Sequence, residues 1–356
     1  MATRVLLAPA AGGKTQACID LVREVLRGDP LAAVWIVVPD RHQGWAIRRR
    51  LAERGGVLGA RAGTFGDLYG ELLALVGLPV AVAPEPVVHR LMRAAIDSLA
   101  ERGALQHYLP IQWRPGFVRI SCDLIAELKR NRIQPERFAE AVSGRGPRLE
   151  ELAELYAEYQ AMLTRIGWAD PEGLGWLAVE ALQRDRTLAA GWRLLVVDGF
   201  DSFNPTQLTA IRLLADRIDE TLITLAGQPD MPRLAHRRFA RTLEMLRDEL
   251  PCCVETLDRV PGPSSPLAHL ESSLFTQHPQ RQPAGDAVVF IEAQNMALEA
   301  REALRWLKAR IVRDGLRPED CAVIARDIEP YRMFLRQVAR EYSLPLRFAS
   351  GEPLAS

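Results

Sequence analysis

The sequence predicts an α/β fold in which a parallel sheet is interrupted by an all-helical insertion. Apolar runs typical of buried parallel strands alternate with helical patterns from the N-terminus to about residue 76. Strand patterns are then absent between about residues 84 and 185, and they return at Arg193. A further α/β pattern begins at Ala287 and has too few strands for a complete sheet of ordinary size.

The elements follow from these patterns in chain order. Strands are expected in the apolar run that begins at Val5 and leads into a small-residue loop, at 34–38 (where Pro39 ends the run), just before Thr64, and at 193–198, 220–226, 252–257, 288–292 and 322–325. Helices are expected at 16–26, 43–54, 65–76, 87–101, 116–130, 135–142, 149–166, 171–183, 297–313 and 330–341.

This organisation predicts three parts. Residues 1–83 and 186–285 form a discontinuous first α/β domain, and residues 84–185 form the helical insertion. Residues 286–356 form the start of a second, truncated α/β domain, reached through a stretch rich in Pro, Gly and Gln.

Composition and charge indicate an ordinary globular protein and argue against secreted and membrane-spanning proteins. Apolar residues make up 48% and charged residues 25%, as in ordinary globular proteins, and the formal net charge is zero. No global field therefore attracts nucleic acid, and such binding requires a local patch. We find neither a signal peptide nor an apolar run of membrane-spanning length, so we expect a cytoplasmic protein with no membrane partner.

The strongest motif is the segment Ala8-Pro9-Ala10-Ala11-Gly12-Gly13-Lys14-Thr15, between the first strand and the first helix. Small residues let backbone N–H groups surround phosphate oxygens, and the helix N-terminus adds partial positive charge. We therefore expect Ala11, Gly12, Gly13, Lys14 and Thr15 to bind the phosphates of ATP. Ala8 stands where the common motif has Gly. The alternative is a Gly-rich turn before an ordinary helix.

Lysine is scarce in this chain, which supports the phosphate-binding interpretation. Only Lys14, Lys129 and Lys308 occur among its 45 basic residues, and the others are Arg. A Lys in this loop therefore indicates that a compact ammonium is needed there.

A second element of the site follows the strand at residues 193–198. Asp198 is expected to complete the shell of a Mg²⁺ ion held by Thr15. The next residue is Gly199. Active superfamily 1 helicases have a Glu at this position that deprotonates the attacking water, so we expect weak or no ATP hydrolysis. Asp198 could instead cap the helix near Pro205, although Asn204 is better placed for that role.

Residues at other strand ends are candidates for contacts with DNA. Phe65 could stack on a base, with Thr64 beside it, and Arg41 could bind a phosphate. The alternatives are that Thr64 caps a helix, that Phe65 packs in the core, and that Arg41 lies on a solvated helix face. Together these features favour a P-loop NTPase of the RecA-like, superfamily 1 helicase type.

Several segments resemble one family closely. Besides the P-loop they include Val37-Val38-Pro39-Asp40-Arg41, Gly63-Thr64-Phe65-Gly66-Asp67-Leu68, the insertion segments 127–136 and 155–159, and 197–203. Residues 299–300 and 322–326 resemble the opening of a second motor-like domain. The chain resembles the N-terminal, UvrD-like part of AddB, the nuclease subunit of bacterial AddAB-type helicase–nucleases. In particular, Asp198-Gly199-Phe200 stands where active UvrD-type motors have an Asp-Glu pair, and this replacement resembles the AddB family.

The resemblance implies a role in processing DNA ends for double-strand break repair and recombination. It implies ATP and Mg²⁺ as ligands, single-stranded DNA or DNA ends as substrate, and an AddA-like motor helicase as partner. The family's nuclease domain and last helicase motifs have no counterpart here, so this chain is expected to lack nuclease activity. Two alternatives stay open: a P-loop kinase or small-molecule ATPase with a helical lid, and an architectural module without nucleotide.

Overall fold

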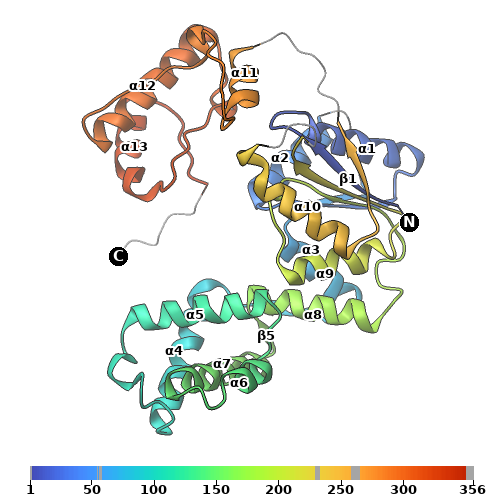
Figure 1. The fold of residues 1–356 in the computed structure, drawn as a ribbon, viewed down its shortest axis with the longest axis vertical. Coiled ribbons are helices and arrows are strands. Elements are labelled where there is room, and N and C mark those ends of the chain that lie inside the picture. The colour runs from blue at the N-terminus through green and yellow to red at the C-terminus, as the bar shows by residue number, and fades with distance from the viewer. Residues whose placement is uncertain (1, 54, 56–57, 229–232, 258–264, 350–356) are drawn as a thin grey trace. The chain divides into compact units, whose positions relative to one another are not determined.

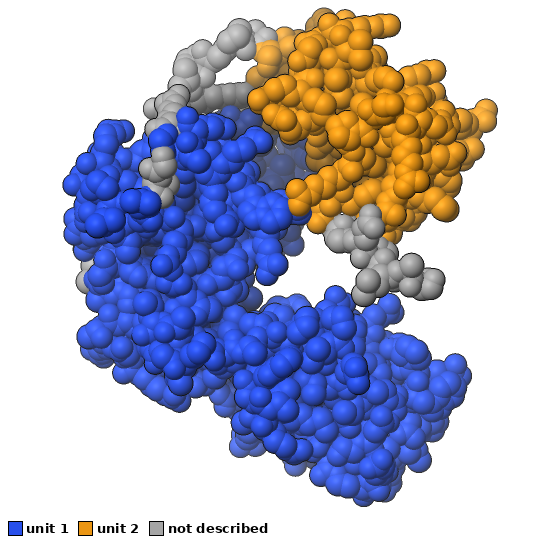
Figure 2. Space-filling model, turned by 180° about the vertical axis from the view of Figure 1, so that it is seen from behind, with its two compact units in different colours: residues 1–262, 274–278 blue, residues 263–273, 279–356 orange. Residues whose placement is uncertain are grey.

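A computed structural model describes residues 2–53, 55, 58–228, 233–257 and 265–349 (Figure 1). The chain divides into two compact units, coloured separately in Figure 2. Unit 1 contains residues 1–262 and 274–278, and unit 2 contains residues 263–273 and 279–356. Within the described ranges, no helix is both long and apolar enough to cross a membrane.

Unit 1 is built on a six-stranded sheet in which every neighbouring pair of strands is parallel. The strand order is β3-β2-β6-β7-β1-β8. The strands are β1 (Ala2–Ala8), β2 (Ala33–Val37), β3 (Ala60–Gly63), β6 (Trp192–Val197), β7 (Glu220–Ala226) and β8 (Cys253–Thr256). The predicted α/β class with a parallel sheet is confirmed.

Helices cover both faces of this sheet because the strands are apolar on both sides. Val5 and Leu7 of β1 belong to one core cluster, and Leu6 between them belongs to the other. Helices α1 (Lys14–Gly28) and α2 (Arg41–Ala52) pack on the Leu6 face. The opposite face packs against α3 (Phe65–Leu75), α8 (Pro171–Arg184), α9 (Pro205–Ala215) and α10 (Arg237–Glu249).

Between β3 and β6 the chain is almost entirely helical, as predicted. Besides α3 and α8, this part of the chain contains α4 (Glu85–Glu101), α5 (Pro115–Arg130), α6 (Pro135–Val142) and α7 (Pro147–Ile166). Helices α4 to α7 enclose a separate apolar core that includes Met92, Ile96, Tyr156 and Tyr159. A two-residue parallel pair, β4 (Ala81–Val82) with β5 (Trp168–Ala169), was not predicted because two residues carry no periodicity.

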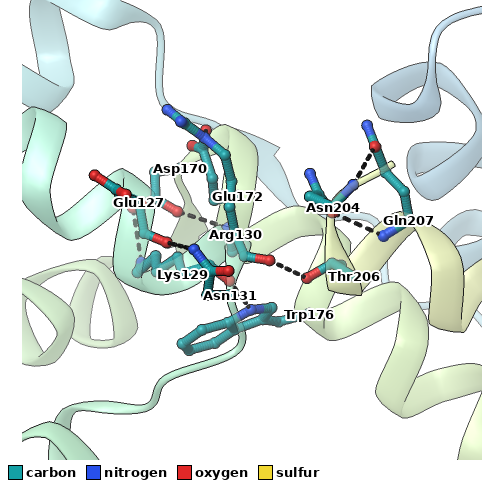
Figure 3. Close-up of polar contacts among 11 residues, drawn as sticks. Glu127, Lys129, Arg130, Asn131, Asp170, Glu172, Trp176, Asn204, Thr206 and Gln207 are labelled. Carbon is teal, nitrogen blue, oxygen red and sulfur yellow. Dashed lines mark hydrogen bonds and ion pairs between the residues drawn. The ribbon is translucent and has the colours of Figure 1, made fainter. Parts of the chain in front are cut away.

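A buried ion pair ties α5 to the start of α8 (Figure 3). The Lys129 Nζ donates to Asp170 Oδ2 at 2.7 Å, and Lys129 is completely buried. The Tyr159 hydroxyl donates to the same carboxylate oxygen at 3.0 Å, and the Gly173 N–H donates to the other at 2.7 Å. Burial lowers the pKa of Lys129, and the Asp170 carboxylate opposes that shift. The attraction between the two charges therefore offsets the hydration that each of them loses on folding.

The C-terminal end of α5 is also joined to α8 and α9. The Trp176 Nε1 of α8 donates to the Lys129 carbonyl at 2.8 Å, and Arg130 forms an ion pair with Glu172 (Figure 3). Arg132, just after α5, donates to the Thr209 hydroxyl of α9 at 3.2 Å. The helical segment is thus joined by polar contacts to helices that pack on the sheet.

Unit 2 contains the helices α11 (Pro266–Ser273), α12 (Met296–Asp314) and α13 (Glu329–Glu341). Apolar side chains of α12 and α13 form a small core of their own. The strands predicted at 288–292 and 322–325 are wrong, since neither segment is a strand and no strand occurs in the described part of unit 2. A strand requires hydrogen bonds to a neighbouring strand, whereas Phe290 and Ile324 are 90% and 91% exposed.

The Lys129–Asp170 pair gives a stability prediction. Replacing Lys129 by Met leaves the Asp170 carboxylate buried without its cation, so Lys129→Met should lower the free energy of unfolding by about 3–5 kcal/mol. Denaturant unfolding measures this value. Arg184→Met is the control, because the Arg184–Glu180 pair lies on the exposed surface of α8 and should contribute about 0–1 kcal/mol. Equal losses in both variants would contradict the prediction.

Candidate nucleotide-binding site

All six strands run in one direction, so the segments that follow them leave from the same edge of the sheet. In parallel α/β sheets this carboxyl edge is where ligands bind. The predicted site residues all follow strand ends: Lys14 and Thr15 come after β1, Arg41 after β2, Thr64 after β3 and Asp198 after β6. The sheet thus brings to one edge residues that are up to 184 positions apart in the sequence.

The loop from β1 to α1 is a tight turn. The Gly12 N–H donates to the Pro9 carbonyl at 3.1 Å, and Ala11 and Gly13 have positive φ angles of 54° and 87°. A Cβ at Gly12 would lie 2.9 Å from both the Ala8 Cβ and the Pro9 carbonyl oxygen. Gly12 therefore makes room for Ala8, which explains how Ala can replace the usual Gly at that position.

The N-terminus of α1 is open toward this loop. Gly13 is its N-cap, and no side chain of a described residue caps the helix. The Lys14 Nζ donates to the carbonyls of Ala8 and Pro9, at 3.0 and 2.8 Å. The Lys14 ammonium group therefore lies against the loop between β1 and α1, next to the backbone N–H groups at the start of α1. Both kinds of donor are those that bind phosphate oxygens.

Asp198 lies beside this loop and receives two hydroxyl groups. The Thr15 hydroxyl donates to Asp198 Oδ2 at 2.7 Å, and the Thr224 hydroxyl of β7 donates to Oδ1 at 2.5 Å. The Asp198 N–H donates to the Val37 carbonyl at 3.0 Å, which fixes the backbone. Asp198 is 4% exposed. The structure thus brings together Thr15 and Asp198, the two predicted Mg²⁺ ligands, and adds Thr224, which sequence analysis did not identify.

The charge of Asp198 is not balanced by an ion pair with any residue that the structure describes. No Lys, Arg or His in those ranges pairs with this carboxylate, whereas Lys129 balances the buried Asp170. Burial, and secondly the Asp198 charge, raise the pKa of the neighbouring Cys18 thiol, so that thiol stays protonated. Carboxylate and hydroxyl oxygens are the ligands that Mg²⁺ prefers. The oxygen atoms of Asp198 and Thr15 therefore fit a Mg²⁺ ion as ligands.

A side chain at Gly199 would be strained and crowded. Its φ angle is +88°, and a Cβ there would lie 2.8 Å from Gln43 Oε1 and 3.3 Å from Pro39 Cδ. Gln43 is held in place by Asp40, the N-cap of α2, whose carboxylate accepts from the Gln43 N–H and Nε2 at 2.9 and 3.0 Å. A glutamate cannot occupy position 199 without a rearrangement of this turn.

The predicted DNA contacts lie at the same edge, in different environments. Arg41 is exposed, and it makes no hydrogen bond or ion pair with any residue in the described ranges. Thr64 caps α3 in a reciprocal arrangement with Asp67. Phe65 is 6% exposed, and its ring centroid lies 5.2 Å from that of Phe200. The structure thus gives Phe65 a role in the core, and base stacking by this ring stays a prediction.

The closed turn at Gly199 gives the next prediction. Gly199→Ala should lower the free energy of unfolding by about 1–3 kcal/mol, because a side chain at positive φ is strained. Gly199→Glu should lose at least as much and should not increase ATP hydrolysis. Gly191→Ala is the matched control, since nothing lies within 4 Å of its Cβ position, and it should change stability by less than about 0.5 kcal/mol. Denaturant unfolding and a steady-state phosphate assay give both readings, and a fully stable, active Gly199→Glu would contradict the prediction.

Comparison with known proteins agrees with the resemblance found in the sequence. Residues 5–250 match the family model described as "ADDB, N-terminal". Three similar curated proteins are each named as a subunit of an ATP-dependent helicase/deoxyribonuclease. That of Moorella thermoacetica is 27% identical, that of Heliobacterium modesticaldum 26% and that of Geobacillus thermodenitrificans 26%.

These alignments cover 99% of this chain but only 33%, 31% and 32% of the respective relatives. The chain thus spans about a third of the length of the curated relatives that it matches. The family match itself extends over more than half of the chain, from the first strand of the sheet to the end of α10. The chain belongs to the family of AddB N-terminal regions.

Proposed function

We propose that this chain is the nucleotide-binding, DNA-contacting part of a helicase–nuclease subunit of the AddB type. The observation that carries the proposal is the buried Asp198 carboxylate. It is oriented by two hydroxyl groups, forms no ion pair with a residue in the described part of the chain, and lies beside the Lys14 loop. A Mg²⁺–nucleotide supplies both a cation for Asp198 and phosphates for the loop.

The proposed fold assigns each part of the chain a role. Residues 1–83 and 186–285 form a P-loop, RecA-like domain that binds ATP, and residues 84–185 form its helical insertion. Residues 286–356 begin a second RecA-like domain. The parallel sheet and the helical segment between β3 and β6 support the first two of these assignments.

Within the first domain, the backbone N–H groups of residues 11–15 and the Lys14 ammonium bind the phosphates. Lys14 now donates to two carbonyls, and phosphate oxygens are stronger acceptors for a cation than neutral carbonyls are. Thr15 and Asp198 hold Mg²⁺, which neutralises phosphate charge when it is bound.

Hydrolysis by this site is weak or absent. A positioned general base contributes about 10²–10⁴-fold to a rate, and the strained, crowded turn disfavours such a side chain at position 199. The group nearest to that position is the Gln43 amide, which cannot accept a proton at neutral pH. We therefore propose that bound nucleotide stabilises one conformation of the protein and does not drive movement along DNA.

Single-stranded DNA follows the carboxyl edge of the sheet in this proposal. The exposed guanidinium of Arg41, which has no partner in the described ranges, supplies a phosphate contact, and Thr64 and Phe65 lie at the end of the next strand. With zero net charge, the affinity is modest and decreases as salt increases.

The remaining proposals come from the relatives, which are named as subunits of ATP-dependent helicase/deoxyribonucleases. We propose that the protein works in the cytoplasm with an AddA-like motor subunit. Together they process DNA ends during double-strand break repair and recombination. Nuclease activity lies outside this chain.

The Lys14 site is tested by titrating a fluorescent ATP analogue with Mg²⁺. Lys14→Ala should weaken binding by roughly tenfold or more, because it removes a charge-assisted hydrogen bond to phosphate. Lys308→Ala is the matched control, since Lys308 donates to the Tyr342 carbonyl in unit 2, and it should bind as the parent does. Equal affinity of parent and Lys14→Ala would refute the site. Steady turnover of a small substrate without DNA would favour a kinase instead.

The role of Phe65 is tested by measuring stability and DNA affinity on the same variant. Because the ring is buried, Phe65→Ala should destabilise the fold by about 3–5 kcal/mol. Phe290→Ala is the control, because that ring is 90% exposed, and it should have little effect on stability. If Phe65→Ala keeps full stability and loses oligonucleotide binding by about 1–3 kcal/mol, the ring is instead a stacking platform.

A further inference from the structure

Two threonines of β7 are both buried, and they differ in what their hydroxyl groups do. Thr221 and Thr224 are each 1% exposed. The Thr221 hydroxyl has no hydrogen-bond partner among the described residues, whereas the Thr224 hydroxyl donates to Asp198 Oδ1 at 2.5 Å. Thr221 therefore contributes only packing, whereas the Thr224 hydroxyl also makes a hydrogen bond.

The position of Thr224 follows from the strand order. Strand β7 lies between β6, which leads to Asp198, and β1, which leads to the Lys14 loop. Thr224 pairs in register with Leu6 of β1, and Ile223 pairs with Val197 of β6. Leu222, two residues before Thr224, belongs to the core on the α1 side of the sheet. Thr224 thus points to the face from which α1 presents Thr15.

The Thr224 hydroxyl limits rotation of the Asp198 carboxylate. The last torsion of an Asp side chain has a broad, weak preference, so the plane of its carboxylate is set by contacts. Here Thr224 holds Oδ1 and Thr15 holds Oδ2. Removing the Thr224 hydroxyl leaves Oδ1 without that donor and lets the plane turn.

This contact does not balance the charge of Asp198. A neutral hydroxyl cannot do what Lys129 does for Asp170, whose carboxylate is held by an ammonium, a phenol and a backbone N–H. Among the described residues, the side-chain donors to the Asp198 carboxylate are two hydroxyls, which orient it and leave its charge available to a bound cation.

We propose that Thr224 is a positioning residue that orients Asp198 and thereby sets how strongly Mg²⁺ enhances nucleotide binding. It acts through Asp198 and Thr15 and touches neither nucleotide nor metal. The inference rests on the proposed nucleotide site at the Lys14 loop and extends it to a residue on a different strand.

The experiment measures ATP affinity by calorimetry with Mg²⁺ and with EDTA, and compares the ratio of the two affinities among variants. Thr224→Val keeps the shape of the side chain and removes the hydroxyl, so the ratio should fall by roughly tenfold, as for loss of one hydrogen bond to a charged group. The affinity in EDTA should change little. Thr224→Ser keeps the hydroxyl and should keep the parent ratio.

Thr221→Val is the matched control, because it makes the same substitution on the same strand at a hydroxyl without a partner among the described residues. It should keep the parent ratio. If Thr224→Val also keeps it, or if Thr221→Val loses as much, the inference is wrong while the nucleotide site stands. Should Thr224→Val fail to fold, Thr224→Ala is measured in its place, and an unchanged ratio in that variant overturns the inference.

Failure of the underlying proposal gives a different result. In that case the parent shows no ATP binding, or Lys14→Ala binds as tightly as the parent in Mg²⁺. Either outcome removes the nucleotide site and, with it, the role of Thr224. The Lys14→Ala arm therefore separates the two failures.

Discussion

The common direction of the six strands is the constraint on which the site depends. Because every neighbouring pair is parallel, residues after β1, β2, β3 and β6 all come to one edge. Parallel strands need a crossover for each connection, and these crossovers supply the helices that bury both faces of the sheet. The helical segment fits within one such connection, between β3 and β6, and leaves the edge intact.

Two buried carboxylates of unit 1, Asp170 and Asp198, differ in the groups that contact them. Asp170 caps α8 and is balanced by Lys129, so its charge is used within the protein. From the side chains that the structure describes, Asp198 receives only hydroxyl groups, and a buried charge without a cation is costly unless a ligand supplies one. The difference lies in the partners, since both side chains are similarly buried.

Much of unit 1 could be predicted because its signals are local. The apolar runs in β2 and β6 and the helical patterns of α4 to α8 follow from residue periodicity. Thr224 could not be predicted as part of the site, because a Thr in an apolar strand is typical of packing and its contact with Asp198 joins different strands. The closure of Gly199 by Gln43 is likewise a contact between segments far apart in the sequence. In unit 2 the apolar segments 288–292 and 322–325 have strand composition but no strand partner in the described residues.

A crystal structure of this chain with Mg²⁺ and a non-hydrolysable ATP analogue tests the nucleotide site most directly. We expect phosphates against the backbone N–H groups of residues 11–15, with Mg²⁺ at Thr15 and Asp198. We also expect the Lys14 ammonium to leave the carbonyls of Ala8 and Pro9 for the phosphates. Crystals grown at saturating analogue in which Lys14 stays on both carbonyls and the loop holds no phosphate would contradict it.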